Sequence, residues 1–325
     1  MSNTQNCIKW IKDYFADNPD GKAIIGISGG KDSTIAAALC VKALGADRVV
    51  GVLMPNGYQS DIEDSEDVCE LLNIRYLTIN IADAYSSIYK EVSDNTNIYI
   101  LNNVFCTNTP ARLRMTVLYG VAACHPNSRV VNTCNRSEDY VGYSTKYGDA
   151  AGDFSPLGNL TVREVLEIGD ELGLPKHLVH KAPSDGMCGK TDEDNLGFTY
   201  EQLDDYILGT AAVDEEVVEK IKKLHKATRH KYKPMPTFRP LHSFTEEAYA
   251  KRGLRANCGI MDDCANGGLV NDVNISGNTG GFIIDSVAYS SPSFGIDYDK
   301  IDMDKFAETM QKIIDSAGCD MLRRK

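Results

Sequence analysis

One short segment of the chain, Ser28-Gly29-Gly30-Lys31-Asp32-Ser33, combines the residue types that bind the phosphates of a nucleotide. Adjacent glycines let the backbone approach an anion, and hydroxyl, ammonium and backbone N–H groups can donate hydrogen bonds to it. Asp32 would repel a phosphate unless a divalent cation lay between them, so an acid in an anion-binding loop indicates Mg²⁺. The segment therefore predicts a site for a nucleotide and magnesium.

This segment lies where a strand-like run, residues 23–27, meets a helix-like run, residues 34–39. The N-terminus of such a helix directs unpaired N–H groups and the positive end of its dipole at an anion. The spacing excludes a Walker A loop, because Asp32 separates Lys31 from Ser33, and it also excludes the Gly-x-Gly-x-x-Gly dinucleotide fingerprint.

Further along, apolar runs alternate with helical patterns. Strands are expected at 48–54, 75–81 and 129–133, and helices at 61–72, 110–125, 161–173 and 214–229, with another helix beginning at 199. The alternation predicts an α/β fold with a doubly wound parallel sheet flanked by helices. The phosphate-binding segment would then lie at the carboxyl edge of the sheet, where ligands bind in such folds.

Composition and charge limit the class of protein. The chain has 325 residues, is 42% hydrophobic and carries a formal net charge of −12, which argues against a broad nucleic-acid surface. It has neither a signal-peptide pattern nor an apolar run of the ~18 residues that a membrane span needs. Its ten cysteines form no Cys-x-x-Cys pair. We therefore expect a cytoplasmic protein with no nucleic-acid or membrane partner.

The pattern changes after residue 237, where glycine, asparagine, serine and aspartate become frequent. We expect one large domain over residues 1–237 and a small C-terminal appendage, residues 238–325, for which no motif assigns a role. The polar stretch 181–196 favours a loop, and both a lid and a plain solvent-exposed connection fit it.

The segment Ser-Gly-Gly-x-Asp-Ser resembles the PP-loop of ATP pyrophosphatases, which cleave ATP between the α- and β-phosphates. This resemblance alone leaves open an amidotransferase, a tRNA sulfur transferase or a nonenzymatic nucleotide sensor. Four further stretches narrow the choice: residues 108–115, 132–138 and 142–156, and the pair His230-Lys231. Together with the loop, they are similar to ammonia-dependent NAD synthetases, in compatible order over residues 8–238.

The resemblance implies a Rossmann-like fold of the adenine nucleotide alpha hydrolase type and a homodimeric ligase. Such an enzyme activates the nicotinate carboxylate of deamido-NAD with ATP and Mg²⁺, forms a deamido-NAD adenylate and releases AMP and pyrophosphate. The loop begins at Ser28, and residues 238–325 lack a convincing glutaminase arrangement. Ammonia, free or delivered by another protein, is therefore the expected nitrogen donor.

The resemblance also implies roles for individual residues. Residues matching the ATP contacts are Gly26, Ile27, Ser28, Gly29, Gly30, Lys31, Asp32, Ser33, Thr133 and Ser184. Asp32 and Glu138 match the magnesium ligands. Positions matching the deamido-NAD contacts are Arg112, Lys146, Asp153, His230 and Lys231, and the catalytic candidates are Lys31, Asp32 and Asp153. The chain departs from the family at Val162, where an ATP-binding lysine is common, and Arg163 is the candidate substitute.

Overall fold

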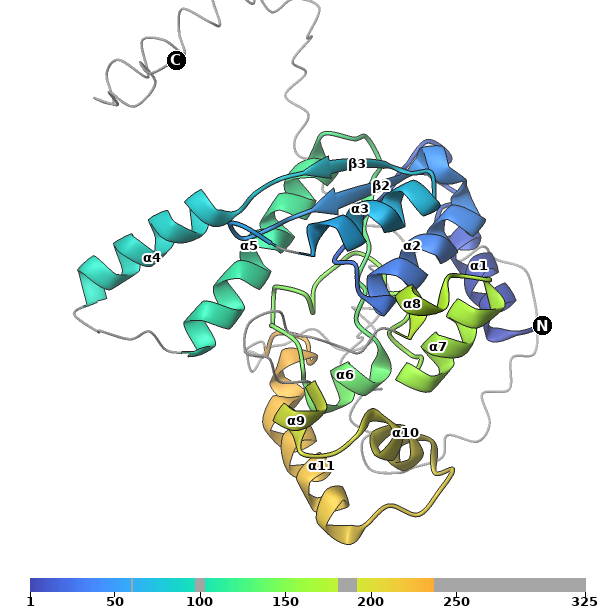
Figure 1. The fold of residues 1–325 in the computed structure, drawn as a ribbon, viewed down its shortest axis with the longest axis vertical. Coiled ribbons are helices and arrows are strands. Elements are labelled where there is room, and N and C mark those ends of the chain that lie inside the picture. The colour runs from blue at the N-terminus through green and yellow to red at the C-terminus, as the bar shows by residue number, and fades with distance from the viewer. Residues whose placement is uncertain (60, 97–102, 181–191, 237–325) are drawn as a thin grey trace, which may run out of the picture. The chain divides into compact units, whose positions relative to one another are not determined.

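The computed structural model describes residues 1–59, 61–96, 103–180 and 192–236 (Figure 1). Within these ranges four strands form one parallel sheet in the order β3-β2-β1-β4. The strands are β1 (Ala23–Gly26), β2 (Val49–Leu53), β3 (Arg75–Thr78) and β4 (Arg129–Val130). The parallel sheet flanked by helices confirms the predicted fold class.

The order of the strands creates a switch point beside β1. From β1 the chain proceeds outward to β2 and β3, and it then returns to pair β4 with the other side of β1. Ile24 accordingly pairs with Val50 of β2 and with Val130 of β4. The chain segments that leave the carboxyl ends of β1 and β4 therefore face each other, which is where an open α/β sheet binds its ligand.

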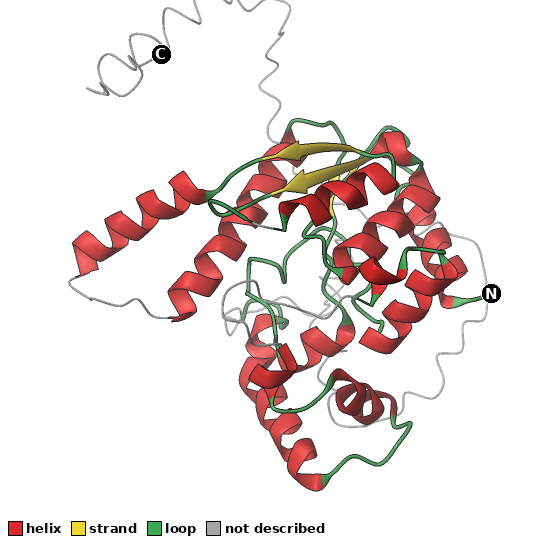
Figure 2. Ribbon diagram, viewed as in Figure 1, coloured by secondary structure: helices red, strands yellow, loops and turns green. Residues whose placement is uncertain are grey.

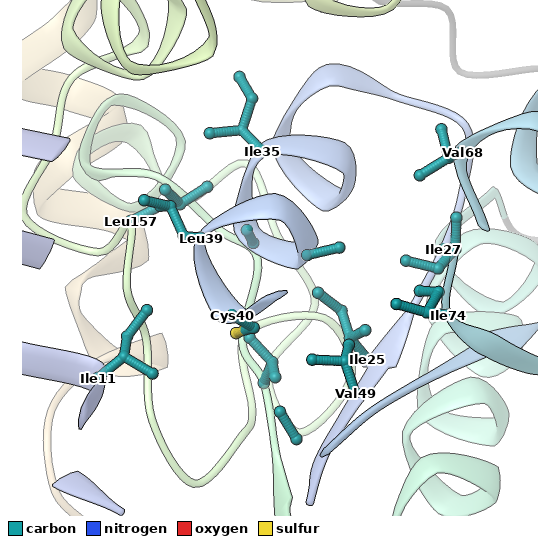
Figure 3. Close-up of a cluster of buried hydrophobic side chains, with 14 of the residues drawn as sticks. Ile11, Ile25, Ile27, Ile35, Leu39, Cys40, Val49, Val68, Ile74 and Leu157 are labelled. Atoms are coloured by element: carbon teal, nitrogen blue, oxygen red, sulfur yellow. The ribbon is translucent and has the colours of Figure 1, made fainter. Parts of the chain in front are cut away.

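Helices cover both faces of the sheet (Figure 2). Side chains alternate between the two faces along a strand, so Ile25 and Val49 belong to one buried cluster and Ile24 and Val50 to the other. The first cluster, drawn in Figure 3, is packed by α1 (Asn3–Tyr14), α2 (Lys31–Leu44), α3 (Ile62–Leu71) and α7 (Val162–Glu171). The second is packed by α5 (Asn103–Ala123).

A third buried cluster lies among the later helices and includes Val141, Leu203 and Ile221. It joins α6 (Arg136–Val141), α10 (Tyr200–Leu208) and α11 (Glu215–Thr228). Two short helices, α8 (Lys176–Val179) and α9 (Asp192–Leu196), complete the described α-helices together with α4 (Ala82–Thr96). This cluster matters for the site because α6 leaves the carboxyl end of the sheet.

Helix α5 corrects one prediction, since it begins at Asn103 and carries Pro110 inside it, whereas the sequence pattern places its start at Pro110. A proline removes one backbone donor and usually marks a helix boundary. Here Phe105, in the turns before the proline, packs against Tyr85 and Tyr89 of α4, with ring centroids 6.1 and 5.9 Å apart. This tertiary contact stabilises the helical turns before Pro110, which local propensity does not favour.

The strands are shorter than predicted. Strand β4 stops at Val130, and the next residue, Val131, bridges to Phe154. Beyond it the side chain of Asn132 donates to the backbone carbonyls of Asp149 and Ala151, at 2.8 and 2.9 Å. The chain therefore pairs with the loop 149–154 instead of continuing the strand.

The predicted loop 181–196 ends in α9, and its residues 181–191 lie outside the described residues, as does the appendage 238–325. In the part of the chain that the structure describes, no helix is both long and apolar enough to cross a membrane.

Candidate active site

The phosphate-binding segment connects β1 to α2 and is held by its own hydroxyl groups. Ser33 Oγ accepts a hydrogen bond from the backbone N–H of Ser28 at 3.2 Å, and the two serine hydroxyl oxygens are 3.1 Å apart. Gly29 adopts a φ of +74°, and a Cβ atom there would lie 2.9 Å from Cβ of Asp64. Only glycine fits both this backbone conformation and the close approach of α3.

Lys31 and Asp32 form an ion pair in the first turn of α2. Nζ of Lys31 lies 2.7 Å from Oδ2 of Asp32, and Lys31 is 8% exposed. Burial lowers the pKa of Lys31, but the negative charges of Asp32 and Glu138 outweigh it, and the pKa is raised above its ordinary value. The ammonium group is therefore charged.

Asn135 joins the two candidate magnesium ligands. Its side-chain Nδ2 donates to Oδ1 of Asp32 at 3.0 Å, and its backbone N–H donates to Oε2 of Glu138 at 3.2 Å. Asn135 is fully buried and also caps α6, because its Oδ1 accepts from the backbone N–H of Glu138 at 3.0 Å. The capping box thus fixes Glu138 beside Asp32 across the switch point.

The electrostatics of this pair fit a divalent cation. Burial and the charge of Asp32 raise the pKa of Glu138 well above its ordinary value, against the opposing effects of Lys31 and the Asn135 N–H. Two neighbouring acids with a single nearby ammonium group leave excess negative charge in a half-buried place. One or two carboxylates combined with substrate phosphates are the ligands that Mg²⁺ usually takes.

A cavity of about 660 Å³ adjoins the loop on the side of α5. Gly26, Ile27 and Ser28 line it from the loop and Thr133 from the segment after β4. This volume is in the range of sites for nucleotide-sized ligands. The structure thus brings Thr133 together with the start of the phosphate-binding segment, and the ATP contact of Thr133 remains a prediction.

The cavity also contains residues that sequence reasoning does not assign to the site. Asn56 and Tyr58 come from the segment after β2, and Arg114 comes from α5. Nε of Arg114 donates to the Met54 carbonyl at 3.0 Å. Burial lowers the pKa of Arg114, and the charge of Asp149 opposes this effect. The stretch 108–115 contains Arg114, but the family resemblance implies a ligand contact only for Arg112, two positions earlier.

The predicted deamido-NAD contacts fall into two groups. In the first, Nε of Arg112 donates to the carbonyl of Lys146 at 3.2 Å, and Nζ of Lys146 donates to the carbonyl of His230 at 2.9 Å. Nζ of Lys231 donates to the carbonyls of Gly142 and Ser144. The structure therefore brings together Arg112, Lys146, His230 and Lys231, although they come from three separate stretches of sequence.

Asp153 lies elsewhere. Its Oδ2 accepts from the backbone N–H of Val130 at 2.7 Å, and its Oδ1 accepts from the Tyr119 hydroxyl at 3.1 Å. It is not among the residues that line the cavity. The structure thus places Asp153 at the end of β4 beside α5, and its catalytic and substrate-binding roles remain predictions.

At the departure from the family pattern, the structure describes both Val162 and Arg163. Val162 is 7% exposed and belongs to the third cluster. The guanidinium of Arg163 pairs with Asp205 of α10, with Nη2 2.8 Å from Oδ1. Arg163 therefore already has an acidic partner on α10. Ser184 lies outside the described residues.

Comparisons with known proteins identify the family of the chain. A family model described as NAD synthase matches residues 3–235. An NH(3)-dependent NAD(+) synthetase of Pyrococcus furiosus is 37% identical over 246 residues, which cover 70% of this chain and 92% of the relative. The solved structure of an NMN synthetase from Francisella tularensis is 37% identical with a TM-score of 0.66, and the match covers 73% and 97% of the two chains. An NH3-dependent NAD synthetase from Campylobacter jejuni is 29% identical with a TM-score of 0.59 and the same coverage.

Proposed function

Because the chain belongs to the NAD synthase family, an enzyme family of the ligase class, we propose how its residues carry out ammonia-dependent synthesis of NAD. The reaction activates the nicotinate carboxylate of deamido-NAD with ATP and then replaces the activating group by ammonia. The observation that carries the assignment of roles is the link made by Asn135 between Asp32 and Glu138, directly beside the phosphate-binding segment.

In the first half of the reaction the carboxylate oxygen attacks the α-phosphorus of ATP, and pyrophosphate leaves. Negative charge accumulates on the phosphates, and backbone N–H groups at the start of α2 and the ammonium of Lys31 lie where they can balance it. Asp32 and Glu138 would hold Mg²⁺, which neutralises phosphate charge when it is bound. The cavity lined by Gly26, Ile27 and Thr133 takes the nucleoside part of ATP.

In the second half ammonia attacks the mixed anhydride, and AMP leaves with the electrons of the broken C–O bond. A carboxylate itself is a poor electrophile, so the preceding adenylation makes the displacement feasible. Arg112, Lys146 and Lys231, with His230 beside them, present a cationic group that suits the pyrophosphate and carboxylate of deamido-NAD. Asp153, at the end of β4, is proposed to accept hydrogen bonds from this substrate or from ammonia.

A homodimer is proposed as the assembly. Ile88 and Val92, one turn apart on α4, are 38% and 41% exposed, and Val104 of the adjoining helix α5 is 60% exposed. Large apolar side chains on two neighbouring helices are typical of an interface between subunits. Size-exclusion chromatography with light scattering checks this assembly, and a monomer at micromolar concentration would contradict it.

Residues 1–237 are proposed to form the synthetase domain, with residues 238–325 as an appendage. The match to the family model ends at residue 235, which supports this boundary. We also propose a cytoplasmic location, because the six cysteines in the described ranges are free thiols, as expected in a reducing compartment.

The similarity to the NMN synthetase structure supports a second candidate substrate. Its TM-score of 0.66 exceeds the 0.59 of the NAD synthetase from Campylobacter jejuni. The same two half-reactions on nicotinate mononucleotide would yield NMN. The two candidates differ only in whether the cationic group receives a dinucleotide or a mononucleotide.

Product analysis tests these proposals. Purified protein is incubated with ATP, magnesium and ammonium, and either deamido-NAD or nicotinate mononucleotide, and the products are identified by mass spectrometry. Equal amounts of NAD, AMP and pyrophosphate are expected with deamido-NAD. Preferential formation of NMN would select the second candidate. Tight ATP binding without pyrophosphate release would favour a nucleotide sensor instead.

A further inference from the structure

The hydroxyl group of Tyr200, the first residue of α10, is buried without a hydrogen-bond partner. Tyr200 is 5% exposed, and no group of the described residues forms a hydrogen bond with its hydroxyl oxygen. Burying an unsatisfied hydroxyl is unfavourable, whereas a phenylalanine of the same shape would avoid that cost. The hydroxyl therefore has a use that the protein without its ligands does not show.

Tyr200 faces the phosphate-binding segment. Nζ of Lys31 lies 5.9 Å from the centroid of its ring, within the range of a cation–π contact. Burial raises the pKa of Tyr200, and so do the negative charges of Glu138, Asp192 and Asp32. Tyr200 is not among the residues lining the cavity proposed for the nucleoside, so it contacts Lys31 away from that cavity.

Helix α10 holds this tyrosine in a fixed place. Thr199 and Gln202 form a capping box at its start, and the N–H of Tyr200 donates to Oε1 of Glu193 at 2.9 Å. One turn later, buried Asp204 accepts hydrogen bonds from the Ser137 hydroxyl and from the N–H of Arg163. Ser137 precedes Glu138 in α6, so α10 is bonded directly to the helix that carries a proposed magnesium ligand.

We propose that the Tyr200 hydroxyl donates a hydrogen bond to a phosphate oxygen in the pyrophosphoryl part of ATP, beside the ammonium of Lys31. The inference rests on the proposed function, because it takes the phosphate site from it. Phosphate oxygens are acceptors that can satisfy the buried hydroxyl, and a hydrogen bond to an ionised acceptor is about twice as strong as a neutral one. The bond persists on pyrophosphate after its separation from the α-phosphorus.

The test uses Tyr200→Phe in the full-length protein. This variant retains the ring, its packing in the third cluster and its contact with Lys31, and it removes only the hydroxyl. Isothermal titration calorimetry measures binding of inorganic pyrophosphate and of AMP in a magnesium-containing buffer. Pyrophosphate should bind about ten- to a hundredfold more weakly to the variant, as for a lost hydrogen bond to a charged group. AMP should bind unchanged.

Without ligand, Tyr200→Phe should unfold at the same temperature as the wild type or at a higher one, because the hydroxyl that it lacks has no hydrogen-bond partner in the wild-type protein. Tyr206→Phe is the matched control, since Tyr206 lies in the same helix but packs against Tyr140, with ring centroids 6.0 Å apart. It should bind pyrophosphate like the wild type.

Wild-type pyrophosphate affinity in Tyr200→Phe would overturn the inference while leaving the proposed function intact. An equal loss of pyrophosphate and AMP binding, or a lower unfolding temperature without ligand, would overturn it as well, because either would reveal a structural role. Failure of the wild-type protein to bind pyrophosphate would contradict the proposed function itself.

Discussion

The side-chain amide of Asn135 donates a 3.0 Å hydrogen bond to the carboxylate of Asp32, which lies 103 residues earlier in the chain. The same residue caps α6 through its side-chain oxygen. One buried asparagine thus fixes both the start of a helix and the separation of two carboxylates. Its two functions can be separated, because a serine side chain can also cap a helix but lacks the amide group that donates to Asp32.

We expect Asn135→Ser to retain most of the stability of the protein and to lose at least about tenfold in kcat/KM for ATP, as for a lost hydrogen bond to a charged group. Asn135→Ala should in addition lose about 1–3 kcal/mol of unfolding free energy, because the cap is removed and buried donors are left unpaired. Steady-state kinetics and urea unfolding measure the two effects. Wild-type kinetics in both variants would show that the link between the carboxylates is not used.

A second prediction concerns the charge of Glu138. Glu138→Gln should reduce NAD formation by at least ~10²-fold, because the site loses the charge of a proposed magnesium ligand beside the phosphates. In magnesium-free buffer the variant should nevertheless be at least as stable as the wild type, since it removes repulsion from Asp32.

Thermal unfolding with and without magnesium distinguishes these effects. Glu216→Gln, which changes an exposed acid in α11, is the control and should alter neither quantity. Magnesium should raise the unfolding temperature of the wild type in the presence of ATP but not that of Glu138→Gln. Equal magnesium stabilisation of both proteins would contradict the assignment of Glu138 as a ligand.

Gly29 provides a test of the loop geometry. Gly29→Ala should lose more stability than the roughly 1–2 kcal/mol that a positive φ costs an alanine, because its Cβ would also meet Asp64 at 2.9 Å. Gly173→Ala is a close control, with a φ of +72° and nothing within 4 Å of the added atom. Urea unfolding compares the two variants, and ATP binding should fail only in Gly29→Ala. Equal behaviour of the two variants would show that contact with α3 does not shape the loop.

Much of this site follows from local sequence, and the rest depends on tertiary contacts. The strand, loop and helix around Gly29 and Lys31 are recognisable because glycine spacing and apolar runs act locally. Two capping boxes, at Thr161 and Thr199, also predict helix starts that the structure confirms. A capping pattern depends on residues three positions apart, so it can be detected without knowledge of the fold.

The unpredicted features depend on residues distant in sequence. The turns of α5 before Pro110 depend on packing against α4. Asn56 and Tyr58 follow β2 in a segment without a motif, and only the sheet order brings them to the cavity. The unpaired hydroxyl of Tyr200 is a property of burial in three dimensions, which no spacing in the sequence indicates.

A further prediction concerns Arg163, the candidate substitute for the ATP-binding lysine that is common in the family at the position of Val162. Its guanidinium pairs with Asp205 of α10, so it is not expected to replace the ATP-binding lysine. Arg163→Ala should leave KM for ATP within about twofold of the wild type and change stability little, since ion pairs near the protein surface contribute weakly. Arg114→Ala, which removes a cavity residue, should raise that KM and serves as the positive control. A tenfold rise for Arg163→Ala would assign Arg163 to the ATP site.

The thiols of the described region predict an order of alkylation. Burial raises the pKa of Cys7 to about 11, from an ordinary value of 9.0, and burial together with Glu66 and Glu70 raises that of Cys69 to about 12. A raised pKa means a smaller thiolate fraction at a given pH, and the thiolate is the reactive form. Cys124, by contrast, is exposed. Iodoacetamide at pH 8 should therefore modify Cys124 first, and the modification of Cys7 should increase as the pH rises from 9 towards 11.

Peptide mass spectrometry after timed quenching measures each site, with urea-unfolded protein as the fully reactive control. Equal rates at Cys7 and Cys124 in the native protein at pH 8 would contradict the packing of α1 against α2.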